Sequence, residues 1–153
     1  MTPRQALLIK DSFTKFGPNA ELAAQVFYDY LFKLAPDARD LFPEDMVPQY
    51  HKFTAMFSVI GGTIDRFDEL ESQIRKLGAR HASYRVRDEH FGAIGEALLM
   101  MLQKRFGKSF TPELKYAWTA AYWRIALIMQ DAAEEAARKR AVEYPERNLY
   151  YVG

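Results

Sequence analysis

The 153-residue sequence contains no cysteine. This absence excludes a disulfide framework, thiolate zinc sites, iron–sulfur clusters and a cysteine nucleophile, and it fits a reducing cytosol. No apolar run reaches the roughly 18 residues that a membrane-spanning helix needs. Residues 1–13 carry charges throughout and lack an apolar run of signal-peptide length. We therefore expect a cytoplasmic protein with no membrane partner.

An excess of charge of one sign is also missing, and histidine is scarce. The 21 basic and 20 acidic residues leave a net charge of +1, so no basic field predicts a nucleic acid partner. Three histidines are too few for a histidine-rich metal-binding tract. Hydrophobic residues nevertheless make up 49% of the chain, which predicts one folded domain with a substantial core.

Apolar residues recur three and four positions apart almost everywhere, whereas strand-like alternation is absent. This pattern predicts an all-α protein of six or seven helices. Thr2-Pro3 and Thr111-Pro112 are typical helix starts. Gly61-Gly62 lies inside a predicted helix and indicates close approach by another helix. Because the apolar period fades after Ala133, we expect the folded domain to span residues 1–133. Residues 134–153 should extend the last helix and end as a tail.

His81 is the sharpest single feature. It follows Ile74 by seven residues and Leu77 by four, so an imidazole shares one helix face with aliphatic side chains. One interpretation is a core histidine with a hydrogen-bonded ring. The other is an iron ligand, because neutral imidazole binds iron when its second nitrogen has an acceptor that sets the tautomer. The carbonyl of Leu77 lies one helical turn before His81 and can accept a hydrogen bond from that N–H. In this interpretation the other ring nitrogen binds iron, and His81 is a proximal haem ligand.

Two polar residues could face the same core. Tyr28 directly follows Phe27 in an apolar helix, and Gln49 precedes Phe53 by four residues. A polar group that faces a core needs a partner, so both are candidates for a ligand-binding role. The alternatives are a tyrosine at the rim of the core with a solvated hydroxyl and a solvated first-turn glutamine.

Three segments resemble bacterial single-domain globins, the globin domain of flavohaemoglobins and neuroglobin-like globins. They are FYDYLFKLAPDARDLF (27–42), LGARHASYRV (77–86) and FTPELKYAWTAAY (110–122). Pro36 and Phe42 match the family's corner proline and its haem-packing phenylalanine. The resemblance spans residues 5 to 133 and implies a globin fold of six to eight helices around a haem pocket, with 1–133 as the globin domain.

The resemblance also implies the cofactor, haem b, and the roles of the residues around it. His81 would bind the iron, and Phe42 would pack flat on the porphyrin. Phe53 and Met56 would limit the ligand space or line the access route, and Lys52 would pair with a propionate or remain solvated. The other predicted cofactor-binding residues are Leu77, through its carbonyl, and the pocket walls Val86, Phe91, Ile94, Leu98 and Tyr122.

On the distal side, the pairing of Tyr28 with Gln49 is similar to the common bacterial distal pair. Gln49 precedes His81 by 32 positions (81 minus 49), similar to the distal-to-proximal interval of flavohaemoglobin-like globins. The alternative alignment makes His51 the distal residue, but it moves Lys52 and Phe53 out of place.

Two positions depart from the flavohaemoglobin pattern. The tyrosine and the glutamate that support the proximal side in those enzymes correspond to Phe91 and Ala133, although Asp131 or Glu134 would serve in a shifted register. Flavohaemoglobins also carry a flavin reductase domain after the globin, and this sequence ends at Gly153. Self-contained nitric oxide dioxygenase activity is therefore not expected.

The resemblance implies reversible binding of oxygen, nitric oxide and other small haem ligands, for oxygen binding, transport or scavenging. The alternatives are a nitric oxide dioxygenase that depends on a separate reductase, a haem-based gas sensor, and a helical bundle without haem. No catalytic side chain is assigned. The sequence leaves open whether the protein is a monomer or a homodimer.

Overall fold

The computed structural model describes residues 1–16, 20–83 and 88–143. These residues form six α-helices and three short 3₁₀ helices, and the described part of the chain contains no strand. The order is α1 (Pro3–Thr14), α2 (Ala20–Leu34), η1 (Pro36–Leu41), α3 (Val47–Thr63), η2 (Ile64–Arg66), α4 (Phe67–Ser83), α5 (Asp88–Phe106), η3 (Gly107–Ser109) and α6 (Pro112–Glu143). The predicted all-α class is confirmed. None of these helices is long and apolar enough to cross a membrane.

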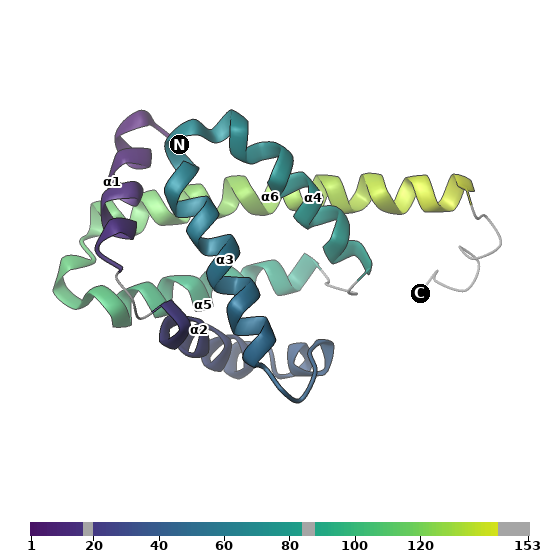
Figure 1. Cartoon of the computed structure of the whole chain (residues 1–153), viewed down its shortest axis with the longest axis horizontal. Helices are drawn as coiled ribbons and strands as arrows, with labels where there is room; N and C mark the ends of the chain where they lie inside the picture. The colour runs from purple at the N-terminus through teal and green to yellow at the C-terminus, as the bar shows by residue number, and fades with distance from the viewer. Residues whose placement is uncertain (17–19, 84–87, 144–153) are drawn as a thin grey trace.

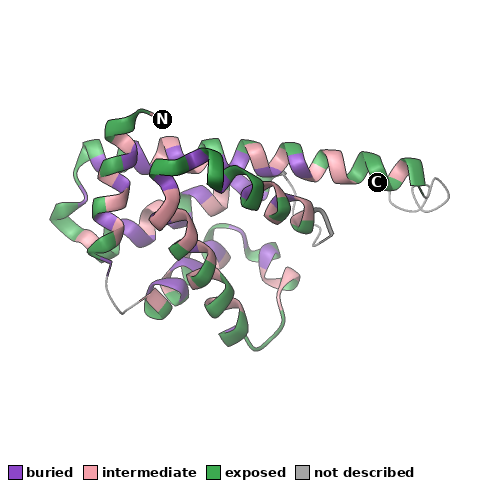
Figure 2. Cartoon of the chain, turned by 45° about the horizontal axis from the view of Figure 1, so that its top comes forward, coloured by how far each residue is buried: buried purple, intermediate pink, exposed green. Residues whose placement is uncertain are grey.

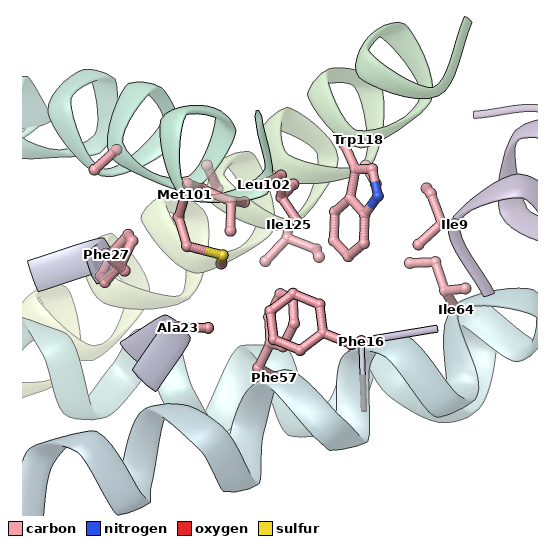
Figure 3. Close-up of a cluster of buried hydrophobic side chains, with 14 of the residues drawn as sticks. Ile9, Phe16, Ala23, Phe27, Phe57, Ile64, Met101, Leu102, Trp118 and Ile125 are labelled. Atoms are coloured by element: carbon pink, nitrogen blue, oxygen red, sulfur yellow. The ribbon is translucent and has the colours of Figure 1, made fainter. Parts of the chain in front are cut away.

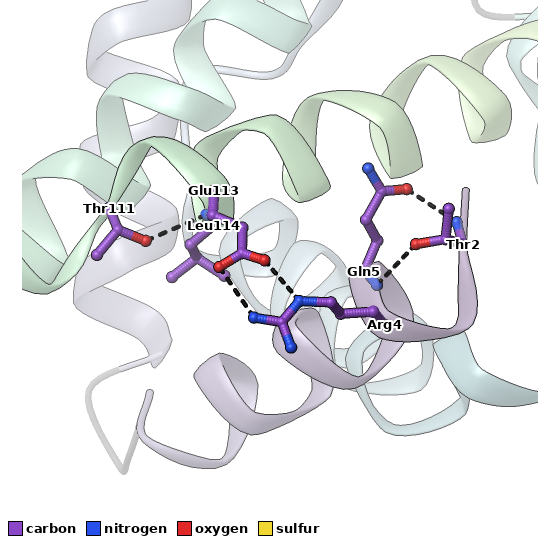
Figure 4. Close-up of polar contacts among 6 residues, drawn as sticks. All are labelled: Thr2, Arg4, Gln5, Thr111, Glu113 and Leu114. Atoms are coloured by element: carbon purple, nitrogen blue, oxygen red, sulfur yellow. Dashed lines mark hydrogen bonds and ion pairs between the residues drawn. The ribbon is translucent and has the colours of Figure 1, made fainter.

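The helix starts predicted from the sequence are capped as expected. The Thr2 hydroxyl accepts a hydrogen bond from the Gln5 backbone N–H, and the Gln5 side chain accepts one from the Thr2 N–H (Figure 4). At the start of α6, the Thr111 hydroxyl accepts from the Leu114 N–H at 3.2 Å. A bidentate ion pair between Arg4 and Glu113 then joins the first turns of α1 and α6 (Figure 4).

One helix begins earlier than its apolar pattern indicates. The sequence predicts a loop from Pro43 to Pro48, yet α3 begins at Val47. Pro48 lies in the first turn, where the missing N–H of proline costs no helical hydrogen bond. As a result, Gln49 stands in the first turn of α3.

The core lies where α1, α3, α5 and α6 meet. Figure 3 shows Ile9, Phe57 and Trp118 converging there from α1, α3 and α6. The Trp118 indole N–H donates to the Ser12 hydroxyl at 3.1 Å, and that hydroxyl donates to the Ile9 carbonyl at 2.7 Å. These two hydrogen bonds satisfy the Trp118 N–H and the Ser12 hydroxyl, and they connect α6 to α1.

Close helix approach occurs at Gly61, as the sequence predicts, because a Cβ there would lie 2.3 Å from the Phe13 ring of α1. The neighbouring Gly62 faces open space, with nothing within 4 Å of a Cβ. A second approach was not predicted: a Cβ on Gly78 would lie 2.5 Å from the Met129 carbonyl oxygen. Here α4, the helix that contains His81, packs directly on the backbone of α6.

Replacing Gly78 with alanine should therefore destabilise the protein. The new methyl group meets backbone, which cannot rotate away, so the free energy of unfolding should fall by about 1–3 kcal/mol despite the better helix propensity of alanine. Gly62→Ala is the matched control, since it adds the same methyl group in open space and should be neutral or stabilising by up to about 1 kcal/mol. Urea unfolding measures both variants, and equal stabilities would contradict the packing of α4 on α6.

The last helix continues past Ala133 to Glu143, and its end projects beyond the other helices (Figure 1). Residues on this projecting end are exposed or half-buried (Figure 2). Arg75 of α4 contacts Asp131 at 3.0 Å and Glu135 at 2.6 Å, which extends the pairing of α4 with α6 past residue 133. The predicted helical extension is thus present to Glu143, and the boundary between domain and tail remains a prediction.

Candidate functional site

Tyr28 and Gln49 meet although they stand on different helices. The Gln49 Nε2 of α3 donates a hydrogen bond to the Tyr28 hydroxyl of α2 at 2.9 Å. Tyr28 is 5% exposed, and burial raises the pKa of its hydroxyl to about 12. The hydroxyl therefore stays protonated at neutral pH. Because it accepts from Gln49, its own proton can be donated to another group.

Aromatic rings surround Tyr28. Its ring centroid lies 5.4 Å from that of Phe42, 5.8 Å from Phe53 and 5.9 Å from Tyr50. Phe53 also stacks on Phe27 at 4.6 Å. Two predicted pocket residues, Phe42 and Phe53, are thus brought against the predicted distal tyrosine. Phe42 reaches it because η1 places it directly after the corner that Pro36 begins.

The two residues between Gln49 and Phe53 that the sequence singled out face outward. The His51 side chain is 64% exposed, and its Nε2 lies 3.8 Å from a Glu21 carboxylate oxygen. Lys52 is exposed as well. This placement favours Gln49 over His51 as the residue that faces Tyr28. Met56 is half-buried on the same helix.

His81 stands near the end of α4 and is held by its own helix. Its Nδ1 lies 2.7 Å from the Leu77 carbonyl oxygen, and since a carbonyl only accepts, Nδ1 carries the proton. Burial lowers the pKa of His81, and the neighbouring Arg80 charge acts in the same direction. The lowered pKa favours the neutral imidazole although the hydrogen bond to Leu77 acts in the opposite direction, and the proton on Nδ1 leaves the lone pair on Nε2. That is the form in which a histidine binds a metal.

The predicted pocket walls come from α5 and α6. Phe91 is 5% exposed, and its carbonyl accepts a hydrogen bond from the Tyr122 hydroxyl of α6. The Tyr122 ring packs on Gly95, where a Cβ would lie 2.6 Å from the ring. Burial raises the pKa of Tyr122, so this donor also stays protonated. Ile94 is half-buried and Leu98 is buried. Val86 lies outside the described residues.

The structure does not favour Asp131 or Glu134 as the carboxylate that would support His81. Asp131 pairs with Arg75 at 3.0 Å, and both Asp131 and Glu134 are exposed. Ala133, the residue at the expected position, has no side-chain acceptor. The acceptor that the structure gives His81 is the Leu77 backbone carbonyl.

Sequence reasoning missed the Tyr122 hydrogen bond and a pair formed by His90 and Asp37. His90 is 5% exposed, and its Nε2 lies 3.2 Å from the Asp37 Oδ2. The available signal was a histidine placed directly before Phe91 in the first turn of α5. Asp37 stands 53 residues away, so no local pattern indicates the pair.

The donor set and the apolar surface fit a haem. A neutral imidazole with Nε2 as its lone-pair atom is the ligand that haem iron takes in many proteins. The residues predicted to line the pocket are apolar and in part solvent-accessible, as a surface that receives a flat macrocycle must be. Those classed as half-buried are Phe42, Phe53, Leu77, Ile94 and Tyr122. Tyr28 and Gln49 add two side chains that can donate hydrogen bonds.

Comparisons with a family profile and with individual proteins all identify similarity to globins. The globin family profile matches residues 25–129. Leghemoglobin-1 of Lupinus luteus is 28% identical over 90% of this chain and 98% of its own length. Neuroglobin of Danio rerio is 31% identical over 75% of this chain and 81% of its length. A flavohemoprotein of Vibrio cholerae is 25% identical over 86% of this chain, but only 34% of that protein is covered.

The fold is also found among solved structures. A bacterial globin from Campylobacter jejuni superposes with a TM-score of 0.78 at 21% identity, covering 90% of this chain and 99% of that one. The predicted globin fold is thereby confirmed.

Proposed function

Because the chain belongs to the globin family, whose members bind haem, we propose that it holds haem b through His81 and binds oxygen reversibly. The observation that carries the proposal is the 2.7 Å contact between the His81 Nδ1 and the Leu77 carbonyl. It sets the tautomer that leaves Nε2 as the coordinating atom. When bound, the haem supplies an iron at which oxygen and other diatomic molecules bind.

On the proximal side, His81 would hold the haem iron through its Nε2, and the hydrogen bond to Leu77 orients the ring. That hydrogen bond is made within one helical turn, so the orientation depends on α4 itself. The packing of Gly78 on the Met129 backbone in turn positions α4 against α6. Rigid support of this kind keeps the coordinating nitrogen at one place.

On the distal side, Tyr28 and Gln49 donate hydrogen bonds to a small ligand. The Tyr28 hydroxyl keeps its proton because burial raises its pKa to about 12. Gln49 can donate to the ligand or to Tyr28, as it does in this structure. Two donors that converge from α2 and α3 would retain a small hydrogen-bond acceptor such as oxygen in the site. Phe42 and Phe53 place apolar rings beside these donors.

The proposal also assigns a role to Lys52. Its ammonium group is exposed, and an exposed cation suits a haem propionate at the solvent edge of the pocket. Such a surface pair contributes little, about 0–1 kcal/mol.

A visible spectrum of the purified protein tests the proposal directly. Supplied with haem, the protein should bind one haem per chain with an intense Soret band. The Soret band of the reduced protein should shift reversibly on exposure to oxygen and carbon monoxide. A protein that folds but takes up no haem would overturn the proposal and leave the helical bundle without haem as the correct interpretation.

A second function, nitric oxide dioxygenase with a separate reductase, is favoured by the similarity to the Vibrio cholerae flavohemoprotein. That similarity covers about a third of the flavohemoprotein, and sustained turnover needs an electron donor, which in this second function is a separate reductase. Steady-state consumption of nitric oxide in the presence of a cellular reductase would support this function. A single turnover would not separate it from oxygen binding.

A further inference from the structure

A histidine and two carboxylates from separate elements lie together beside the start of α5. Asp37 belongs to η1, and Glu89 and His90 belong to the first turn of α5. Each residue offers one ligand atom, and the three atoms lie within 4.8 Å of one another. The described residues thus contain a set of one nitrogen and two oxygen donors that no haem role uses.

The set has a buried anchor. The His90 side chain is 6% exposed, and its Nε2 lies 3.2 Å from the Asp37 Oδ2, whereas Asp37 and Glu89 are exposed. The imidazole is therefore held in place by packing, and the carboxylates reach it from solvent. An ion could enter from the open side without disturbing the core. A purely acidic surface cluster has no such fixed nitrogen donor.

We propose that Asp37, Glu89 and His90 form a site for a divalent transition-metal ion of the zinc type. Imidazole nitrogen with carboxylate oxygen is a donor set for zinc, whereas calcium and magnesium take oxygen donors. Zinc bonds to these atoms are about 2.0–2.2 Å long, which places neighbouring ligands of a tetrahedral site about 3.3 Å apart. The His90–Asp37 separation of 3.2 Å already matches. Rotation of the exposed Glu89 side chain supplies the third ligand, and water takes the fourth position.

The affinity should be moderate. All three side chains already make other interactions, which the ion would have to displace or share. A site with three protein ligands is also less closed than a structural zinc site with four.

An ion at this position should stabilise the folded protein. It would join η1, which leads into Phe42, to the start of α5, which leads into Phe91. A bond between these segments stabilises the native state over the unfolded chain, where the ligands stand 53 residues apart in the sequence. This effect does not require haem, so the site stands independently of the function proposed above.

Isothermal titration calorimetry with zinc chloride, on protein as purified and freed of zinc by a chelator, tests the site. The wild type should bind one zinc per chain. The exposed substitutions Asp37→Asn and Glu89→Gln each remove one ligand and should weaken binding by more than about tenfold. His51→Gln is the matched control, because it removes an exposed histidine that lies 3.8 Å from a single carboxylate, and it should bind zinc as the wild type does.

X-ray absorption spectroscopy at the zinc edge then tests whether the His90 imidazole binds the ion, without substitution of a buried residue. The zinc-loaded wild type should show one imidazole nitrogen among its ligands, and so should His51→Gln. Thermal unfolding should shift upward with zinc in the wild type and not in Asp37→Asn. The proposal is overturned if the wild type binds no zinc, if the Asp37 and Glu89 variants bind it with wild-type affinity, or if no imidazole coordinates the ion.

Discussion

Replacing His81 with alanine is expected to abolish stable haem binding. The substitution removes the Nε2 atom that we assign to the iron, and no other histidine can substitute, because His51 is exposed and His90 pairs with Asp37. Loss of a supporting partner of a metal ligand already costs about 10–100-fold in affinity, so loss of the ligand itself should speed haem release by at least about 100-fold. Haem transfer to apomyoglobin, followed at the Soret band, measures the rate.

The control for this result is His51→Ala. It removes an exposed imidazole that contacts Glu21, and the spectrum and the rate of haem release should remain as in the wild type. In His81→Gly, added imidazole should restore the wild-type spectrum, because the lost group is then supplied from solution. Wild-type haem retention in His81→Ala would contradict the proximal assignment.

Tyr28→Phe is expected to speed oxygen release by about 5- to 10-fold. It removes one hydrogen bond to the ligand, worth about 1–1.5 kcal/mol, while the ring and its packing against Phe42 and Phe53 remain. The double variant Tyr28→Phe with Gln49→Leu removes both donors and should release oxygen roughly 30-fold faster or more. Stopped-flow mixing of the oxygenated protein with dithionite or carbon monoxide gives these rates.

Tyr50→Phe is the matched control for the distal pair. Tyr50 is a half-buried tyrosine whose ring centroid lies 5.9 Å from that of Tyr28, so the variant removes a hydroxyl from the same aromatic group. Its oxygen release should match that of the wild type. Equal rates in Tyr28→Phe and the wild type, or equal acceleration in Tyr50→Phe, would show that Tyr28 is not the donor.

The features that local geometry determines were predictable. The contact of His81 with Leu77 follows from four-residue spacing on one helix, and the Thr2 and Thr111 starts follow from the chemistry of helix caps. Gly61 was correctly interpreted as a close approach, yet Gly62 shows no such contact, because only one of two adjacent helical residues can face a given neighbour.

The contacts between helices were not predictable from spacing. Nothing local indicates that Trp118 donates to Ser12, 106 residues earlier, or that Tyr122 donates to the carbonyl of Phe91. The same holds for Gly78, whose role depends on the Met129 backbone. Such contacts depend on how helices cross, and the crossing depends on side-chain shapes across the whole core.

By itself, the sequence determined the helical class, the starts of α1 and α6, and a histidine held by its own helical turn, because these depend on periodicity and on residues three or four apart. Only the tertiary structure decided that Gln49, and not His51, faces Tyr28, because the first turn of α3 begins before Pro48 and meets α2 at one angle. It also decided that His90 meets Asp37, since packing alone brings residues so distant in sequence together.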